Sequence, residues 1–131
     1  MASVLVIEDN PANMKLAALV LEKAGYAVLQ AREAETGLAL ARAEHPDLIL
    51  MDIQLPGMDG LTATRILKSD AATAGIKIVA LTAFAMKGDE ENIRAAGCDG
   101  YIAKPIRHKK FLSEIESHLA RKNISENPPS T

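Results

Sequence analysis

Short apolar runs alternate with stretches of helical periodicity along the chain, and this alternation constrains the fold more than any other feature. The apolar runs have the length and the Val/Ile/Leu content of strands buried on both faces. They occupy residues 4–7, 27–31, 48–51, 78–81 and, more weakly, 100–102. Five successive strand–helix units predict an α/β fold, a parallel sheet with helices on both faces.

The intervening helices have recognisable ends. Asn10 and Pro11 are an N-cap followed by proline at the first helical position, and Gly25 closes that helix. Four further helices are predicted, the second from Ala34 to before His45 and the others over 61–67, 89–96 and 111–119. The helix over 89–96 offers only one large apolar side chain, so we expect it to be the least firmly packed and the easiest to move.

Length and composition indicate one ordinary globular domain. The chain has 131 residues, of which 48% are hydrophobic and 24% charged, and its formal net charge is -2. This balance favours neither nucleic acid nor an anionic membrane as a partner, and no signal peptide or membrane span is expected. The single cysteine, Cys98, excludes an internal disulfide and fits a reducing cytosol. We predict a domain over 1–122 and a disordered tail over 123–131.

Acidic residues stand at the ends of two predicted strands. Glu8 and Asp9 follow the first strand, and Asp52 follows the run at 48–51. In an open parallel sheet, ligands bind beyond the carboxyl ends of the strands, where the strand order reverses. The doubly wound, flavodoxin-like (βα)5 order 2-1-3-4-5 makes strands one and three neighbours, so we expect these carboxylates to meet.

Carboxylates held this close need compensation by a cation. Mg2+ suits such a cluster, because it takes one or two carboxylates and keeps several waters. A bound metal neutralises phosphoryl oxygens, and aspartate is a competent nucleophile that forms an aspartyl-phosphate. The cluster therefore predicts a metal-dependent phosphoryl site.

Two further residues fall at the same edge of the sheet. Thr82 ends the fourth strand, and Lys104 follows the fifth, where it could pair with a carboxylate at rest and with a phosphoryl oxygen after transfer. The Lys104-Pro105 bond is a candidate for the cis form. Each residue alone is explained as a turn former, a helix cap or a surface charge, but their joint position favours a site.

These motifs together resemble the receiver domain of bacterial two-component response regulators. The resemblance covers roughly residues 3–121 and is carried by Glu8-Asp9, Asp52 with Gln54-Leu55-Pro56-Gly57-Met58-Asp59-Gly60, Thr82-Ala83 and Lys104-Pro105. It implies that Asp52 accepts a phosphoryl group from a sensor histidine kinase or a histidine phosphotransfer protein. It also implies Mg2+, with Mn2+ as an alternative, bound by Asp9, Asp52 and the backbone carbonyl of Gln54, with Glu8 acting through water.

The resemblance further implies a switch and no turnover of a substrate. Lys104 would contact the phosphoryl group and Thr82 would donate a hydrogen bond to it, while Tyr101 would turn inward when Thr82 moves. The protein would phosphorylate itself from phosphodonors and lose the group slowly. Phe84 lies at a position that controls access of the hydrolytic water in this family, and it is bulkier than many members carry.

The signal is expected to leave by protein–protein contact. Met14, Pro105 and Ile106 are predicted to form an apolar patch that docks the phosphodonor, with Phe84 also on the partner surface. The basic run at 107–110 indicates either a solvated face or a site for an acidic partner. We expect a cytoplasmic monomer or weak dimer that partner kinases recruit to the cell poles.

A narrower resemblance is to single-domain regulators of bacterial cell division and polarity. It is carried by residues 13–16, 52–56 and 81–90. A motility regulator is the alternative within the same class. Less favoured alternatives are a phosphatase with an Asp nucleophile, which would need an acid where Gln54 stands, and a flavodoxin-like FMN carrier, whose phosphate Glu8 and Asp9 would repel.

Overall fold

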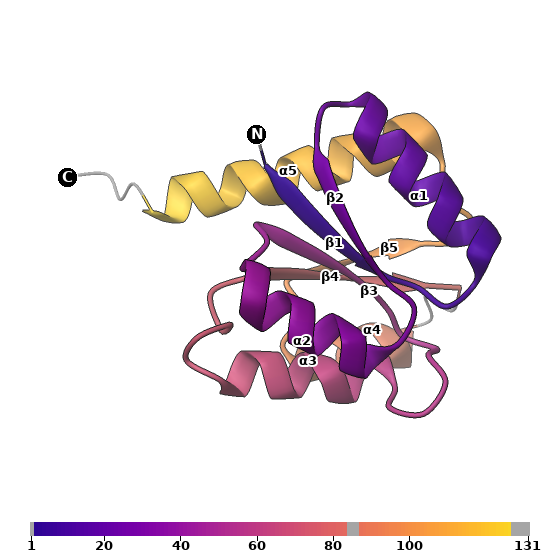
Figure 1. The fold of residues 1–131 in the computed structure, drawn as a ribbon. Helices are drawn as coiled ribbons and strands as arrows, with labels where there is room; N and C mark the ends of the chain where they lie inside the picture. The colour runs from indigo at the N-terminus through magenta and orange to yellow at the C-terminus, as the bar shows by residue number, and fades with distance from the viewer. Residues whose placement is uncertain (1, 84–86, 127–131) are drawn as a thin grey trace.

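The fold is a single parallel sheet between two layers of helices (Figure 1). The computed structural model describes residues 2–83 and 87–126. The strands are β1 (Ser3–Ile7), β2 (Ala27–Ala31), β3 (Leu48–Asp52), β4 (Lys77–Thr82) and β5 (Gly100–Ala103). The helices are α1 (Pro11–Lys23), α2 (Ala34–Glu44), α3 (Gly60–Ser69), α4 (Lys87–Ala96) and α5 (His108–Glu126).

All strands run parallel in the order β2-β1-β3-β4-β5, as the sequence predicts. The central strands β1, β3 and β4 are almost wholly buried, whereas the edge strands β2 and β5 are partly exposed. Central strands that are covered on both faces need continuous apolar runs, and this explains why their sequences do not alternate.

The core has two halves, one on each face of the sheet. α1 and α5 cover one face, where Leu21, Phe111 and Ile115 pack against the strands. α2 and α3 cover the other face, where Leu38 and Leu67 pack. α4 lies beside α3, and of its residues 88–96 only Ile93 and Ala96 are buried, in agreement with its weak apolar content.

The helix ends follow local chemistry. The Asn10 side chain accepts a hydrogen bond from the Asn13 N–H at 3.0 Å, and Gly25 has a φ of 98° beyond the end of α1. α4 begins at Lys87, ahead of the predicted start at residue 89. α5 continues to Glu126, past the boundary predicted at residue 122, and residues 127–131 lie outside the described residues.

Two predicted features can be compared directly with the structure. The peptide bond between Lys104 and Pro105 is cis, the form for which the sequence made it a candidate. Over the described residues, no helix combines the length and the apolar content needed to cross a membrane.

Candidate functional site

The predicted acidic residues meet where β1 and β3 lie side by side. Ile7 pairs with Met51 in the sheet, so Glu8 and Asp52 follow them at adjacent positions. Glu8 is 1% exposed and Asp52 is 3% exposed, whereas Asp9 is only half-buried. Each of the three offers a carboxylate oxygen, and these oxygens lie within 4.8 Å of one another. The sheet topology thus concentrates three acids in one place.

Lys104 supplies a positive charge to the two buried acids. Its Nζ lies 2.8 Å from Glu8 Oε1 and 3.2 Å from Asp52 Oδ2. The backbone holds Lys104 in place, because its N–H donates to the Thr82 carbonyl at 2.8 Å. One lysine therefore bridges the ends of β1 and β3 from the loop after β5.

Backbone N–H groups hold the other carboxylate oxygens. The Gln54 N–H donates to Asp52 Oδ1 at 3.0 Å, and the Asn10 N–H donates to Glu8 Oε2 at 3.1 Å. Each donor lies two residues after its acid, the spacing of an Asx-type turn. These amides were not predicted from the sequence, although their two-residue spacing from each acid is a signal that identifies them.

Gly60 has a structural role at the site that was not predicted from the sequence. A Cβ built on it would lie 2.1 Å from the Asp52 carbonyl oxygen, and its N–H donates to the Ile53 carbonyl at 3.0 Å. The loop after β3 therefore returns so closely to the acid-bearing strand that only glycine fits. Asp59, the N-cap of α3, accepts from the Thr62 N–H at 2.8 Å and anchors the same loop.

Burial and proximity shift the pKa values of the buried pair. Burial, then the nearby Glu8 carboxylate, raises the pKa of Asp52 from 3.8 to about 6, against the lowering influence of the Gln54 N–H and Lys104. Burial would also raise the pKa of Glu8, but hydrogen bonds with Asp52, Lys104 and Asn10 outweigh it and lower that pKa. Burial would lower the pKa of Lys104, but the two acids outweigh it and raise it. The pair shares its charge unevenly, with Asp52 the member that holds a proton more readily.

The donor set fits a hard divalent cation. Among the described residues, Glu8 Oε1 makes an ion pair with Lys104 but no well-directed hydrogen bond, so this buried oxygen retains acceptor capacity. Asp9 adds a less buried carboxylate beside it. Carboxylate oxygens with room for water are what Mg2+ prefers, and one Lys104 charge does not neutralise three acids.

The family comparison agrees with this geometry. Residues 4–116 match the family described as the response regulator receiver domain. The chain belongs to this family.

Relatives of this receiver include the polar-differentiation response regulators DivK of two Brucella species. The protein of Brucella ovis is 51% identical over 117 residues, covering 89% of this receiver and 95% of the relative. The protein of Brucella anthropi is 50% identical over the same coverage. The family match favours a receiver over the phosphatase and the flavin carrier that the sequence left as alternatives.

Solved structures with the same fold include the receiver domain of a sensor histidine kinase and a chemotaxis protein. The receiver domain of sensor histidine kinase PA1611 from Pseudomonas aeruginosa, solved with a magnesium ion in its active-site cleft, is 35% identical with a TM-score of 0.80, covering 92% of this receiver and 95% of that chain. The chemotaxis protein CheY4 of Vibrio cholerae is 25% identical with a TM-score of 0.86, covering 89% and 98%.

The predicted switch residues occupy neighbouring strands of the receiver. Thr82 ends β4 and is buried, and the neighbouring strand β5 carries Tyr101. Tyr101 is half-exposed, and its hydroxyl donates a hydrogen bond to Glu90 on α4, which raises the pKa of the tyrosine. This hydrogen bond links β5 to α4, the helix with few buried side chains among its described residues.

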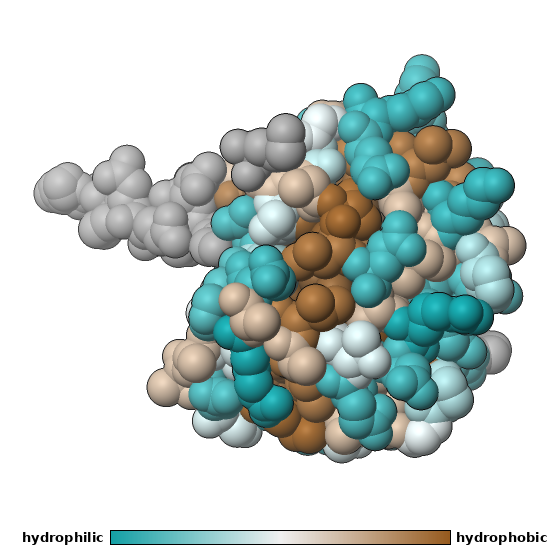
Figure 2. All heavy atoms as spheres, in the orientation of Figure 1, coloured by the Kyte–Doolittle hydropathy of each residue, from teal (hydrophilic) through white to brown (hydrophobic). Residues whose placement is uncertain are grey.

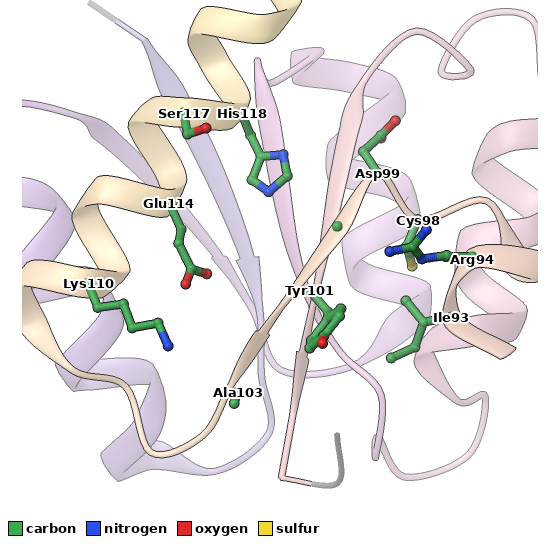
Figure 3. A pocket seen from close by; sticks show the side chains of 11 residues that line it. Ile93, Arg94, Cys98, Asp99, Tyr101, Ala103, Lys110, Glu114, Ser117 and His118 are labelled. Atoms are coloured by element: carbon green, nitrogen blue, oxygen red, sulfur yellow. The ribbon is translucent and has the colours of Figure 1, made fainter. Parts of the chain in front are cut away.

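A groove of 630 Å³ opens over β5 between α4 and α5. In Figure 3, Tyr101 lies on β5 between side chains of α5 and those near α4. The residues that line it include Ile93, Arg94, Tyr101, Lys110, Glu114 and His118. The groove therefore brings Tyr101, the predicted switch residue, and charges of both signs to one surface.

Met14, one of the residues predicted to dock the phosphodonor, is largely buried. It is 6% exposed and packs in the core, but it also lines a groove of 450 Å³ beside Lys15 and Leu19, so its part in docking stays a prediction. Met14 stands one helical turn before Ala17 on the buried stripe. The large apolar side chains that α1 exposes are Leu16 at 42% and Leu19 at 50%. Pro105 is exposed.

The remaining members of that surface differ in exposure. Ile106 is half-buried against the core, and Phe84 lies outside the described residues. The basic residues at 107–110 are all exposed. Within the described part of the chain they make no ion pair, so their charges face solvent or a partner.

Proposed function

We propose that Asp52 accepts a phosphoryl group from a phosphohistidine of a sensor kinase or a phosphotransfer protein. The observation that supports this is the position of Lys104 Nζ, which contacts both Glu8 and Asp52 beside the third acid, Asp9. Three carboxylates and the Lys104 ammonium at the carboxyl end of the sheet would suit a phosphoryl group that binds together with a metal ion.

In the proposed transfer, an Asp52 oxygen attacks the phosphorus of the phosphohistidine. The P–O bond forms as the P–N bond breaks, and the electron pair of that bond returns to the imidazole nitrogen. Asp52 must be ionised to attack, and its raised pKa means that it competes with a proton near neutral pH. The Gln54 N–H holds one oxygen and thereby orients the other.

We assign Asp9, Asp52 and the Gln54 backbone carbonyl as ligands of Mg2+, or Mn2+ as an alternative, with Glu8 acting through water. When bound, the ion would neutralise the phosphoryl oxygens and favour the ionised form of Asp52. Lys104 would then exchange a carboxylate oxygen for a phosphoryl oxygen. Thr82, which ends the adjacent strand, would donate its hydroxyl to the phosphoryl group.

We propose that the signal passes from Thr82 to Tyr101 and α4. The phosphoryl group adds about -1.5 to -2 charges and three acceptor oxygens, which would pull Thr82 and Lys104 toward Asp52. Of residues 88–96 in α4 only Ile93 and Ala96 are buried, so α4 is the element that would move at least cost. The groove over β5 would then present a changed surface to a downstream protein.

We further propose a role in cell-division and polarity control in the cytoplasm, with recruitment to the cell poles by partner kinases. The support is the 51% identity to polar-differentiation regulators along nearly their whole length. A motility role is the second candidate, supported by the likeness to chemotaxis protein CheY4. Binding to a flagellar motor component, rather than to a polarity regulator, would favour it.

The site assignment can be tested with a small phosphodonor. Incubation of the full chain with acetyl phosphate and Mg2+ should give a base-labile adduct at Asp52, located by mass spectrometry. EDTA should abolish the adduct, and the isosteric variant Asp52→Asn should not label. Equal labelling of the Asn variant would refute the assignment.

The partner assignment needs a separate experiment. Phosphotransfer profiling against the histidine kinases and phosphotransfer proteins of the same cell should identify a kinetically preferred donor. Asp52→Asn is the control for transfer to this position. A donor from a motility pathway would replace the polarity assignment and leave the site intact.

A further inference from the structure

Among the described residues, no strand pairs with the outer side of β2, and β2 lacks the features that normally protect such an edge. β2 has the sequence Ala-Val-Leu-Gln-Ala, with no charge and no proline. Natural edge strands are usually blunted by lysine, proline or a bulge, because exposed N–H and C=O groups recruit another strand. The register with β1 is continuous from Ser3–Ala27 to Ile7–Ala31, so β2 has no bulge.

The backbone geometry defines which groups face outward. The Ala27 N–H donates to the Ala2 carbonyl and the Glu8 N–H donates to the Ala31 carbonyl, both at 3.0 Å. In a parallel strand alternate residues point both backbone groups to the same side. Ala27, Leu29 and Ala31 therefore face β1, and Val28 and Gln30 direct their N–H and C=O groups away from the sheet.

The same edge carries an exposed apolar band. Figure 2, drawn in the orientation of Figure 1, shows hydrophobic residues running down the face where β2 lies, between the two helical layers. The partly buried residues here are Tyr26 and Val28 on the α1 side and Leu29 and Leu40 on the α2 side. Leu19 of α1, 50% exposed, lines the adjoining groove of 450 Å³.

The charged residues beside the band are of opposite sign at its two ends, so an antiparallel second copy of the edge would match them. The groove is lined by Lys15 and Arg32 near one end and by Glu22 at the other, whereas Lys23 does not line it. Glu22 lies at the N-terminal end of β2, because the Gly25 N–H donates to its carbonyl at 3.0 Å in the turn before the strand. Arg32 directly follows the C-terminal end of β2.

A two-fold axis through Leu29 uses all of these features at once. This axis places the N-terminal end of β2 in one copy beside the C-terminal end of β2 in the other. Arg32 of each copy then approaches Glu22 of the other copy. Val28 then faces Gln30 of the mate, and the two residues exchange backbone hydrogen bonds in an antiparallel pair. A different protein with charges of one sign would complement either Lys15 and Arg32 or Glu22, but not both ends of the edge.

We propose that the β2 edge is the interface of a symmetric homodimer, in which two copies of this chain pair through β2 and form one continuous sheet. The occupant of the apolar edge is thus a second copy. The pair leaves the carboxyl end of β3 and the groove over β5 uncovered, because both lie away from the β2 edge.

Sedimentation velocity of the full, unphosphorylated chain tests this proposal. We expect a monomer–dimer equilibrium that becomes visible between about 10 µM and 1 mM, the range of a small interface. Gln30→Pro removes the outward N–H, which edge strands tolerate, and should leave only monomer. The matched control Gln30→Ala keeps that N–H and should dimerise like the natural chain. Equal labelling of both variants by acetyl phosphate would show that they are folded.

Swapping the charges of Arg32 and Glu22 provides a second test. Restored dimerisation in the double variant would not be expected if these residues only stabilised the fold of each copy. Arg32→Glu and Glu22→Arg should each weaken dimerisation about tenfold or more, and the double exchange should restore it. A monomer at every concentration would overturn the proposal. So would a dimer that persists in Gln30→Pro, or one that Tyr101→Ala abolishes, because either result would place the interface elsewhere.

Discussion

Lys104 and Asp52 form a salt bridge of 3.2 Å across the carboxyl edge of the sheet, from a loop after β5 to the end of β3. The same Lys104 nitrogen contacts Glu8 at 2.8 Å, so one cation compensates two buried acids. The Lys104 side chain is 17% exposed, which limits screening by solvent. The resting site therefore depends on a charge that the proposed phosphoryl group would redirect.

Replacing Lys104 with methionine keeps much of the side-chain volume and removes this charge. We expect Lys104→Met to destabilise the metal-free protein by about 1–3 kcal/mol at pH 8, because two buried carboxylates lose their shared partner. Urea unfolding in EDTA measures this, with Lys104→Arg as the control that keeps the charge. The same variant should take phosphoryl from acetyl phosphate at least about tenfold more slowly. A Met variant as stable and as reactive as the natural chain would contradict this role.

Asp52 should make stability depend on pH in the absence of metal. Its pKa rises from 3.8 to about 6 in the folded state, so the native protein binds more protons than the unfolded chain between these values. Stability therefore falls as pH rises through this window and stays reduced above it. In EDTA, Asp52→Asn should be more stable than the natural chain by about 1–3 kcal/mol at pH 8.

The difference should vanish below the unfolded pKa, because both side chains are then neutral. Denaturant unfolding at pH 3.5 and at pH 8 checks both limits. Saturating Mg2+ should reverse the order at pH 8, since it stabilises only the chain with the full ligand set. A constant difference between the two proteins at all pH values would show that the effect is not ionisation of Asp52.

The sheet order and the acidic site were predictable because strand ends carry their own signals. Apolar runs that stop at Glu8 and Asp52 identify both the strand and the edge at which its last residue emerges, and right-handed crossovers then bring the two ends together. Thr82 and Lys104 were predictable for the same reason. The position of Lys104 also indicated that it could pair with a carboxylate. That it contacts both Glu8 and Asp52 was not predictable, because this depends on the path of a loop.

The exposure of the predicted partner surface was less predictable. Met14 was predicted to belong to a docking patch, and the structure places it one turn before Ala17 among the buried residues of α1. Helical periodicity identifies the buried face, but the width of that face depends on the neighbouring helix, which local sequence does not describe. Leu16 and Leu19 are exposed because no described element covers that side of α1. Gly60 was unassigned because its constraint comes from the Asp52 carbonyl and not from its own turn.

Gly60→Ala tests the close approach of the loop to β3. The added Cβ would lie 2.1 Å from the Asp52 carbonyl oxygen, a backbone atom that cannot move without shifting the site. We expect a loss of stability of about 2–4 kcal/mol and slower labelling of Asp52. Gly75→Ala is the matched control, because no atom lies within 4 Å of the Cβ it would add. Equal stability of the two variants would show that the loop can relax away from β3.

The bond between Tyr101 and Glu90 should restrain α4 in the resting state. Tyr101→Phe removes the hydroxyl and keeps the ring, so α4 loses a tether while the carboxylate cluster is unchanged. Amide hydrogen exchange in α4 should become about fivefold faster, the effect of roughly one hydrogen bond, whereas exchange in β1 and β3 should not change. Glu90→Gln, which retains an acceptor, should have a smaller effect, and both variants should label at Asp52 as the natural chain does. Unchanged exchange in α4 would mean that its packing through Ile93 and Ala96, and not the tyrosine, sets its mobility.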